Sequence, residues 1–196
     1  MKRFIIGTLA LAASLLATGC GLLGGSGLGN SGNNRTYVFN NLPQTVSELQ
    51  ALPQADMKDP YAVAALTLVA LTNYESNNAE CIKMLDYLKG PESVSGYEIQ
   101  FYRDRLQGKQ YKIWSYFLGA TPGNNYTPSK PYKITVSSNP YSFDNENWAT
   151  LWVTSGGADN PRSIKLRKKP STGQWFLNDI QCLSDIRLPA SEDKWR

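Results

Sequence analysis

Residues 61–75 read YAVAALTLVALTNYE, a segment with no charged side chain before Glu75. It is apolar on nearly every side from Tyr61 to Leu71, and Asp59-Pro60 supplies an N-cap residue followed by proline at the first helical position. A helix that is apolar all round belongs in the interior of a fold. The sequence therefore predicts a buried central helix that other elements cover.

Further helices are expected on both sides of this segment. Thr45-x-x-Glu48 and Ser95-x-x-Glu98 are capping-box patterns, in which a hydroxyl and a carboxylate satisfy the first free N–H groups of a helix. A helix over residues 79–89 carries Ile82, Leu85 and Leu88 on one face and ends at Gly90-Pro91. Three to four helices are thus predicted in the N-terminal half.

The pattern changes to strands in the C-terminal half. Residues 119–131 form a loop rich in Gly, Pro and Asn, and the segments after it alternate apolar and polar side chains or are rich in Trp, Val and Leu. Strands are expected at residues 133–137, 148–154, 163–169 and 174–181. Helices followed by consecutive hairpins predict an α+β fold, with the helices packed on an antiparallel sheet of about four strands.

The N-terminus has the order of a secretory signal. Lys2 and Arg3 precede an apolar run over residues 4–16, and small residues follow at 17–19. A spanning helix needs about 20 apolar residues, more than this run offers. We therefore expect residues 1–19 to be a signal peptide.

Cys20 follows the small residues directly, and Ala17-Thr18-Gly19-Cys20 resembles the lipobox of bacterial lipoproteins. The resemblance implies that the Cys20 thiol is acylated and that the acyl chains hold the protein in membrane lipid without a membrane-crossing helix. The protein would then lie at the cell envelope, outside the cytoplasm. We expect no cofactor. Ala17 stands where that pattern favours Leu, so cleavage after Gly19 and secretion is the alternative. Residues 20–34 then form an uncharged Gly-rich tether, and residues 35–196 form a single domain.

The composition removes several classes of function. The chain has no histidine, so Ser-His-Asp and Cys-His catalysis are impossible within it, and a metal site is not expected. A net charge of +4 requires no nucleic-acid partner. For an enzyme only carboxylate pairs remain, either Asp144 with Glu146 or Asp179 with Asp185, as in a hydrolase. We expect a non-enzymatic domain and keep the hydrolase as an alternative.

Two groups of side chains are candidates for ligand binding. Tyr126, Tyr132, Tyr141 and Trp148 lie among Asn and Asp residues, a combination that suits sugar rings, although the same aromatics would also pin a long loop to the domain. Arg103 and Arg105 suit an anion, or they are surface charges of a helix with Asp104 as an internal partner.

Two further features allow two interpretations each. Lys165, Arg167, Lys168 and Lys169 form a basic strand that either protects a sheet edge, which we favour, or meets anionic headgroups. Cys81 and Cys182 are either a disulfide or two buried free thiols.

Several blocks together resemble a bacterial domain family of unknown function. These blocks are ALTLVALTNYESNNAECIKMLDYLKGP (65–91), FYRDRLQGK (101–109), GATPGNNYTPSKPYKITV (119–136) and RKKPSTGQWFLND with LSDIRLP (167–189). The resemblance implies no activity. The sequence thus predicts an exported, lipid-anchored, non-enzymatic binding domain whose ligand it does not identify. The alternative is a module that binds cell wall or glycan through the aromatic residues of 126–148, and an envelope protein is a further candidate partner.

Overall fold

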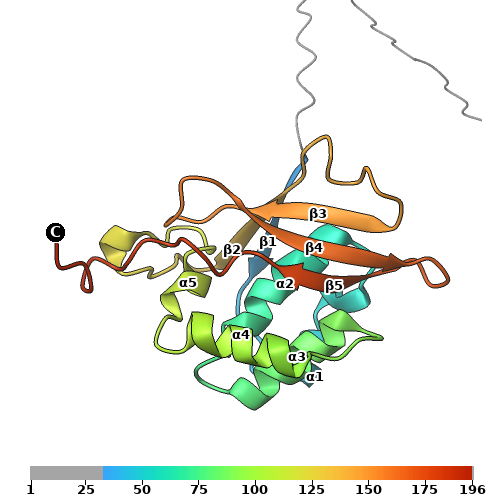
Figure 1. Cartoon of the computed structure of the whole chain (residues 1–196), viewed down its shortest axis with the longest axis horizontal. Coiled ribbons are helices and arrows are strands. Elements are labelled where there is room, and N and C mark those ends of the chain that lie inside the picture. Colours follow the sequence, from blue (N-terminus) through green and yellow to red (C-terminus); the bar gives the residue numbers. More distant parts are fainter. Residues whose placement is uncertain (1–32, 196) are drawn as a thin grey trace, which may run out of the picture.

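The computed structural model describes residues 33–195, which form a layer of helices on one side of a five-stranded antiparallel sheet (Figure 1). The predicted α+β fold is confirmed. The predicted signal peptide, Cys20 and the predicted tether up to residue 32 fall outside the described residues. Only residues 33 and 34 of that tether are described.

The helices follow the predicted order, with one addition. They are α1 (Val46–Gln50), α2 (Pro60–Leu71), α3 (Asn78–Lys89), α4 (Gly96–Leu106) and α5 (Tyr111–Trp114), with short 3-10 turns at Pro53–Asp56 and Pro122–Asn124. The sequence did not predict α5, which is a single turn too short to show a periodic pattern.

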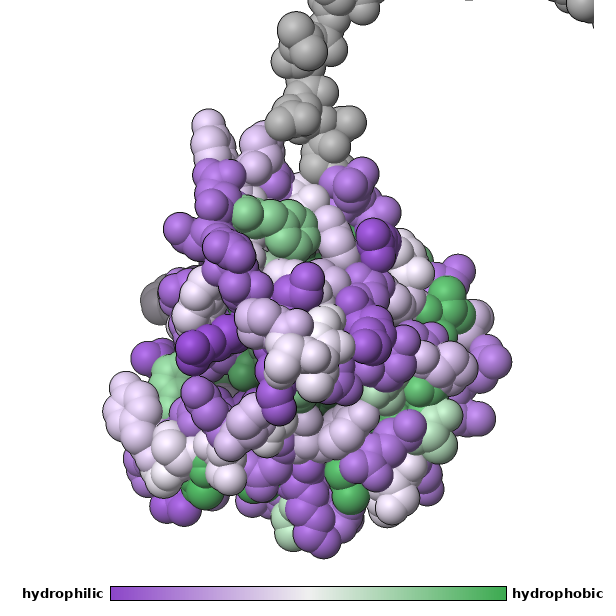
Figure 2. Space-filling model, turned by 90° about the vertical axis from the view of Figure 1, so that its right-hand side faces the viewer, coloured by the Kyte–Doolittle hydropathy of each residue, from purple (hydrophilic) through white to green (hydrophobic). Residues whose placement is uncertain are grey.

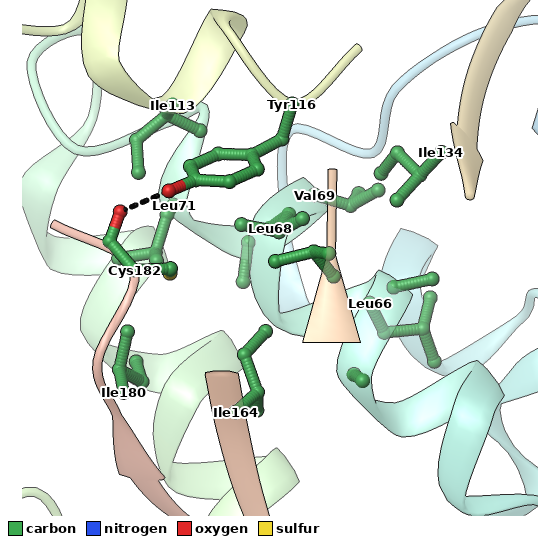
Figure 3. Close-up of a cluster of buried hydrophobic side chains, with 14 of the residues drawn as sticks. Leu66, Leu68, Val69, Leu71, Ile113, Tyr116, Ile134, Ile164, Ile180 and Cys182 are labelled. Atoms are coloured by element: carbon green, nitrogen blue, oxygen red, sulfur yellow. Dashed lines mark hydrogen bonds between the residues drawn. The ribbon is translucent and has the colours of Figure 1, made fainter. Parts of the chain in front are cut away.

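Every residue of α2 is buried, as its sequence predicts. The helix contacts all five strands and packs against α3. Figure 3 shows its leucines and Val69 beside Ile134, Ile164 and Ile180, which come from three different strands. Thr67, the polar residue in the middle of α2, donates its hydroxyl to the Val63 carbonyl at 2.9 Å and so leaves no unsatisfied group.

The helix starts use the predicted caps. Asp59 accepts from the Tyr61 N–H at 3.1 Å, and the Ser95–Glu98 capping box is complete. At α1 only half of the box forms: Thr45 accepts from the Glu48 N–H, but the Glu48 carboxylate accepts from Gln44 rather than from Thr45.

The sheet has five strands in the order β1-β2-β3-β4-β5. The four predicted strands are present as β2 (Tyr132–Ser137), β3 (Trp148–Val153), β4 (Arg162–Lys169) and β5 (Gln174–Ile180). The fifth, β1 (Asn34–Phe39), pairs with β2 and begins at the last residue assigned to the tether. About four strands were expected, so the count is corrected to five.

The sheet order corrects the interpretation of the basic strand. β4 pairs with β3 on one side and with β5 on the other, so it is an interior strand and its lysines do not protect an edge. The edges are β1 and β5. Alternation along a strand shows which side chains share a face, but it does not show which strands are outermost.

The middle of the sheet is split between β2 and β3, which pair at only two positions. The segment after α5 fills the split: Leu118 donates its N–H to the Lys133 carbonyl at 2.9 Å, and Gly156 donates its N–H to the Ser115 carbonyl at 2.8 Å. Among the described residues, no helix is long and apolar enough to cross a membrane.

Candidate functional site

A hollow of about 330 Å³ lies where the end of α3 meets β4 and β5, and we call it the basic cavity. Its lining comes from three segments: Lys89, Pro91 and Glu92 at the end of α3 and just beyond it, Arg167 to Pro170 at the end of β4, and Phe176 to Asn178 in β5. Figure 2 views the molecule from the side of the β4–β5 turn, where hydrophilic residues dominate and hydrophobic ones appear as separate spots.

Local backbone geometry brings these segments together. Gly90, just after α3, has φ of +66°, which suits glycine, and a Cβ atom there would overlap the Phe176 ring. The glycine therefore lets the end of α3 approach β5 closely. On β4, Arg167 is in register with Phe176 of β5, and Lys168 is in register with Trp175.

Positive charge dominates the basic cavity. Four cations line it against one carboxylate, that of Glu92. Arg167 lies 3.8 Å from Glu92, but both side chains are more than half exposed, so this contact is weak. Within the described part of the chain, Lys168 and Lys169 form no ion pair. The cavity therefore keeps an excess of positive charge that protein carboxylates do not neutralise.

Lys89, which lines the basic cavity, is held in place by an ion pair with Glu98. Its side chain is only 5% exposed and its Nζ donates to the Glu98 carboxylate at 2.8 Å. Partial burial works to raise the pKa of Glu98, but the hydrogen bonds from Lys89 and Ser95 outweigh it and keep that pKa below its ordinary value. The pair joins the end of α3 to the start of α4.

Tyr126 is not available to a ligand. It is 2% exposed, it donates its hydroxyl to the Arg187 carbonyl at 2.7 Å, and its ring stacks on Tyr111 with centroids 5.6 Å apart. Burial raises the pKa of its hydroxyl to about 12. The structure corrects the sequence-based assignment: Tyr126 pins the loop to the domain.

The other aromatic candidates do not form one pocket. Tyr132 is half-buried between Trp114 and Phe117, Tyr141 is 76% exposed, and Trp148 is 38% exposed on the outer face of the sheet with Arg167 over its ring. Tyr132 and Trp114 line a separate hollow of about 270 Å³ with several amide side chains. Loop paths, which the sequence pattern does not specify, separate these rings.

Arg103 and Arg105 lie on the exposed face of α4. Asp104 accepts from Gln100 Nε2 at 2.8 Å and forms no ion pair with either arginine, so the expected internal pair is absent from the described residues. Arg105 lies over the Phe101 ring and lines a hollow with Lys109 and Lys112. Lys112 donates to the Leu183 carbonyl at 3.1 Å, which engages this cation.

Cys81 and Cys182 are both buried, and the structure has them as free thiols rather than as a disulfide. Burial raises the pKa of each thiol to about 12, which keeps both protonated and unreactive at neutral pH. The Cys182 carbonyl accepts from the buried Tyr116 hydroxyl at 2.6 Å (Figure 3). These cysteines belong to the core.

The carboxylates of the hydrolase alternative are on the surface. Asp144 and Glu146 lie exposed in the loop before β3, and Asp179 lies 3.7 Å from Lys165. Neither the basic cavity nor the hollow on α4 contains more than one carboxylate. No cluster of three or more residues able to ligate a metal occurs at positions 33–195.

The fold is an α+β domain with a hollow of about 330 Å³, lined mainly by cations, on its surface. Residues 41–190 match the family described as "Domain of unknown function (DUF6935)", and the chain belongs to this family. The family resemblance predicted from the sequence is confirmed. No curated protein and no solved structure shows a significant match to the chain. The matched segment begins after β1, so the first strand lies outside it.

Tyr126→Phe should lower the free energy of unfolding by about 1 kcal/mol, because the Arg187 carbonyl loses its buried hydrogen-bond partner. Denaturant unfolding measures the change. Tyr141→Phe is the matched control, since that tyrosine is 76% exposed and its hydroxyl makes no protein hydrogen bond in the described structure. Equal stability of the two variants would contradict the pinning role.

Glu98→Gln should reduce the dependence of stability on acid pH. A carboxyl whose pKa is depressed by folding stabilises the folded state above its unfolded pKa, about 4.5, and loses that contribution as the pH falls through the folded value. Wild type should therefore lose stability below about pH 4.5 more steeply than Glu98→Gln. Unfolding curves measured across this range test it, with Glu92→Gln, which removes an exposed carboxylate, expected to follow wild type.

Proposed function

We propose that this protein is an exported, Cys20-anchored binding domain without enzymatic activity, and that its ligand is a small anion held in the basic cavity. One observation carries the proposal: Arg167, Lys168 and Lys169 line a hollow of about 330 Å³ whose only carboxylate is Glu92, while its fourth cation, Lys89, is paired with Glu98. Ligand pockets in proteins commonly measure about 300–1,000 Å³. The size therefore suits a small phosphorylated or carboxylated molecule.

The lining also suggests how such an anion is held. Arg167 presents a guanidinium, which binds phosphate or carboxylate in a bidentate manner, and Lys169 adds a second charge. Phe176 and Leu177 provide apolar surface beside these charges. Charged hydrogen bonds are stronger where nearby apolar groups exclude water, so Phe176 and Leu177 strengthen the attraction between the cations and a bound anion.

The residue types in the basic cavity support binding rather than turnover. Its lining includes no serine, threonine or cysteine that would act as a nucleophile, and Glu92 is its only carboxylate. Hydrolysis by a carboxylate pair needs a second carboxylate, which this lining does not contain. The anchor rests on the signal-like segment and on Cys20.

A glycan is the second candidate ligand, favoured by the hollow that Tyr132 lines. Trp114 and Tyr132 give it aromatic surface, and amide groups of Asn40, Asn41 and Gln44 lie around them. Aromatic rings pack on the C–H faces of sugars while amides bond the hydroxyls. Of the four aromatic residues chosen from the sequence, only Tyr132 lines this hollow.

Metabolic labelling with an alkyne fatty acid tests the anchor. Cells that make the full chain should incorporate the label into the wild-type protein, and Cys20→Ala should abolish it, because the acyl chains attach to the Cys20 thiol. Cys81→Ala is the control and should label as wild type does, since that thiol is buried. An unlabelled wild type, or a labelled Cys20→Ala, would contradict lipidation.

A ligand panel of phosphorylated, carboxylated and neutral sugars tests the basic cavity. Anionic members should raise the melting temperature of the protein, because a ligand that binds only the folded state stabilises it. Arg167→Gln combined with Lys169→Gln should abolish the rise, and added salt should reduce it. Thermal unfolding followed by fluorescence measures both effects.

The matched control for this panel is Arg105→Gln, which removes a cation from the hollow on α4. It should leave the rise unchanged. Loss of the rise in Arg105→Gln alone would place the anion on α4 instead. A rise with neutral sugars that Asn41→Ala removes would support the glycan candidate and contradict an anionic ligand.

A further inference from the structure

We propose that the loop between β2 and β3 rests on the lipid headgroups of the membrane, with Tyr141 as its contact residue. This inference rests on the proposed anchor at Cys20 and adds an orientation to it. It is carried by the position at which the chain reaches the domain, by the exposure of Tyr141 and by the rigid construction of the loop.

The chain reaches the domain beside this loop. Asn33 accepts from the Ser138 N–H at 3.1 Å and donates its own N–H to the Ser138 hydroxyl at 3.3 Å, so the start of β1 is bonded to the start of the loop. Figure 1 shows this corner, with the loop above the sheet. Cys20 is thirteen positions before Asn33, and this stretch spans at most about 45 Å, so an acylated Cys20 keeps this corner near the bilayer.

The loop holds Tyr141 outward. The Tyr141 N–H donates to Asn139 Oδ1 at 2.9 Å, and the Ser142 carbonyl accepts from the Thr150 N–H at 2.9 Å, which ties the loop to β3. Phe143 is 44% exposed, and its ring lies 6.2 Å from those of Tyr61 and Trp175. Tyr141 is left 76% exposed next to the exposed Pro140. Little conformational entropy is lost when a ring presented in this way meets a surface.

The chemistry of the loop fits a membrane interface. Tyrosine combines an apolar ring with a polar hydroxyl and is enriched at the level of the headgroups. The loop also carries Asp144 and Glu146, which offset the charges of Arg167 and Lys168 beside its far end, where the Asn147 carbonyl accepts from the Lys168 N–H at 2.8 Å. The nearby Arg35 is paired with Asp59 at 2.9 Å. The loop therefore has no excess of positive charge. Its attachment depends on the aromatic ring rather than on anionic lipid, and it should be insensitive to salt.

The Tyr141 ring alone would bind a membrane weakly. A weak contact is sufficient to orient the domain when the Cys20 anchor already holds it at the membrane. A tether turns the second contact into an intramolecular step with a high effective concentration. The loop begins beside the start of β1 and its far end adjoins the basic cavity, since the Asn147 carbonyl accepts from the Lys168 N–H at 2.8 Å.

Matched tryptophan probes test the contact. Full chains carrying Tyr141→Trp or Tyr97→Trp are produced in bacteria and reconstituted in phosphatidylethanolamine–phosphatidylglycerol vesicles with brominated acyl chains, which quench tryptophan that reaches the interface. Tyr97 is the control because it is an 81% exposed tyrosine on α4, on the other side of the domain (Figure 1). Bromolipid should remove most of the fluorescence that Tyr141→Trp adds and leave that of Tyr97→Trp, at low and high salt alike.

Equal quenching of the two probes, or none at Tyr141→Trp, overturns the inference. The same preparations labelled with the alkyne fatty acid show whether the anchor fails as well. A labelled protein whose Tyr141→Trp fluorescence persists keeps the anchor and loses the orientation. Quenching at Tyr141→Trp that disappears in high salt would also overturn it, because that contact would be electrostatic.

Discussion

The fold depends on the need to bury α2 on every side. A helix with a polar face can lie at a surface, but Pro60–Leu71 has none, so each part of its circumference must meet another element. The sheet covers one side and α3 another. This requirement explains why a sheet split between β2 and β3 is closed by the segment after α5 rather than left open, since the gap would expose the core to water.

Most of the helices and strands could be predicted because the residues that determine them lie within one short segment of sequence. The apolar circumference of α2, the caps at Asp59 and Ser95 and the alternation in β2 and β4 are each contained in a short segment. β1 was missed although Thr36 to Phe39 are all residues that favour strands, because its partner lies about a hundred residues further along the chain and the pairing is not visible locally. The position of β4 inside the sheet was missed for the same reason: strand order is a property of the whole domain.

The candidate site was less predictable than the fold, since a cavity is formed by segments that the sequence keeps apart. The lysines of β4 were identified as a group, but their neighbours Lys89 and Phe176 come from α3 and β5, and only the close approach at Gly90 brings them together. Tyr126 shows the reverse case. Its neighbourhood of amides suits a binding loop, yet its ring is buried against Tyr111 and its hydroxyl is taken by Arg187.

The order of the strands gives the two proposed surfaces a physical relation. β1 follows the N-terminal segment directly and forms one edge, while β5 carries the basic cavity at the other edge. The loop between β2 and β3 connects the two, because its first residue, Ser138, is bonded to Asn33 and its last residue, Asn147, accepts from the Lys168 N–H at 2.8 Å. Phosphate of lipid and phosphate of a soluble ligand bind arginine and lysine in the same way, so the two proposed ligands would compete for the cations of β4. The loop that is proposed to meet the headgroups carries Asp144 and Glu146, whose charge disfavours anionic lipid beside these cations.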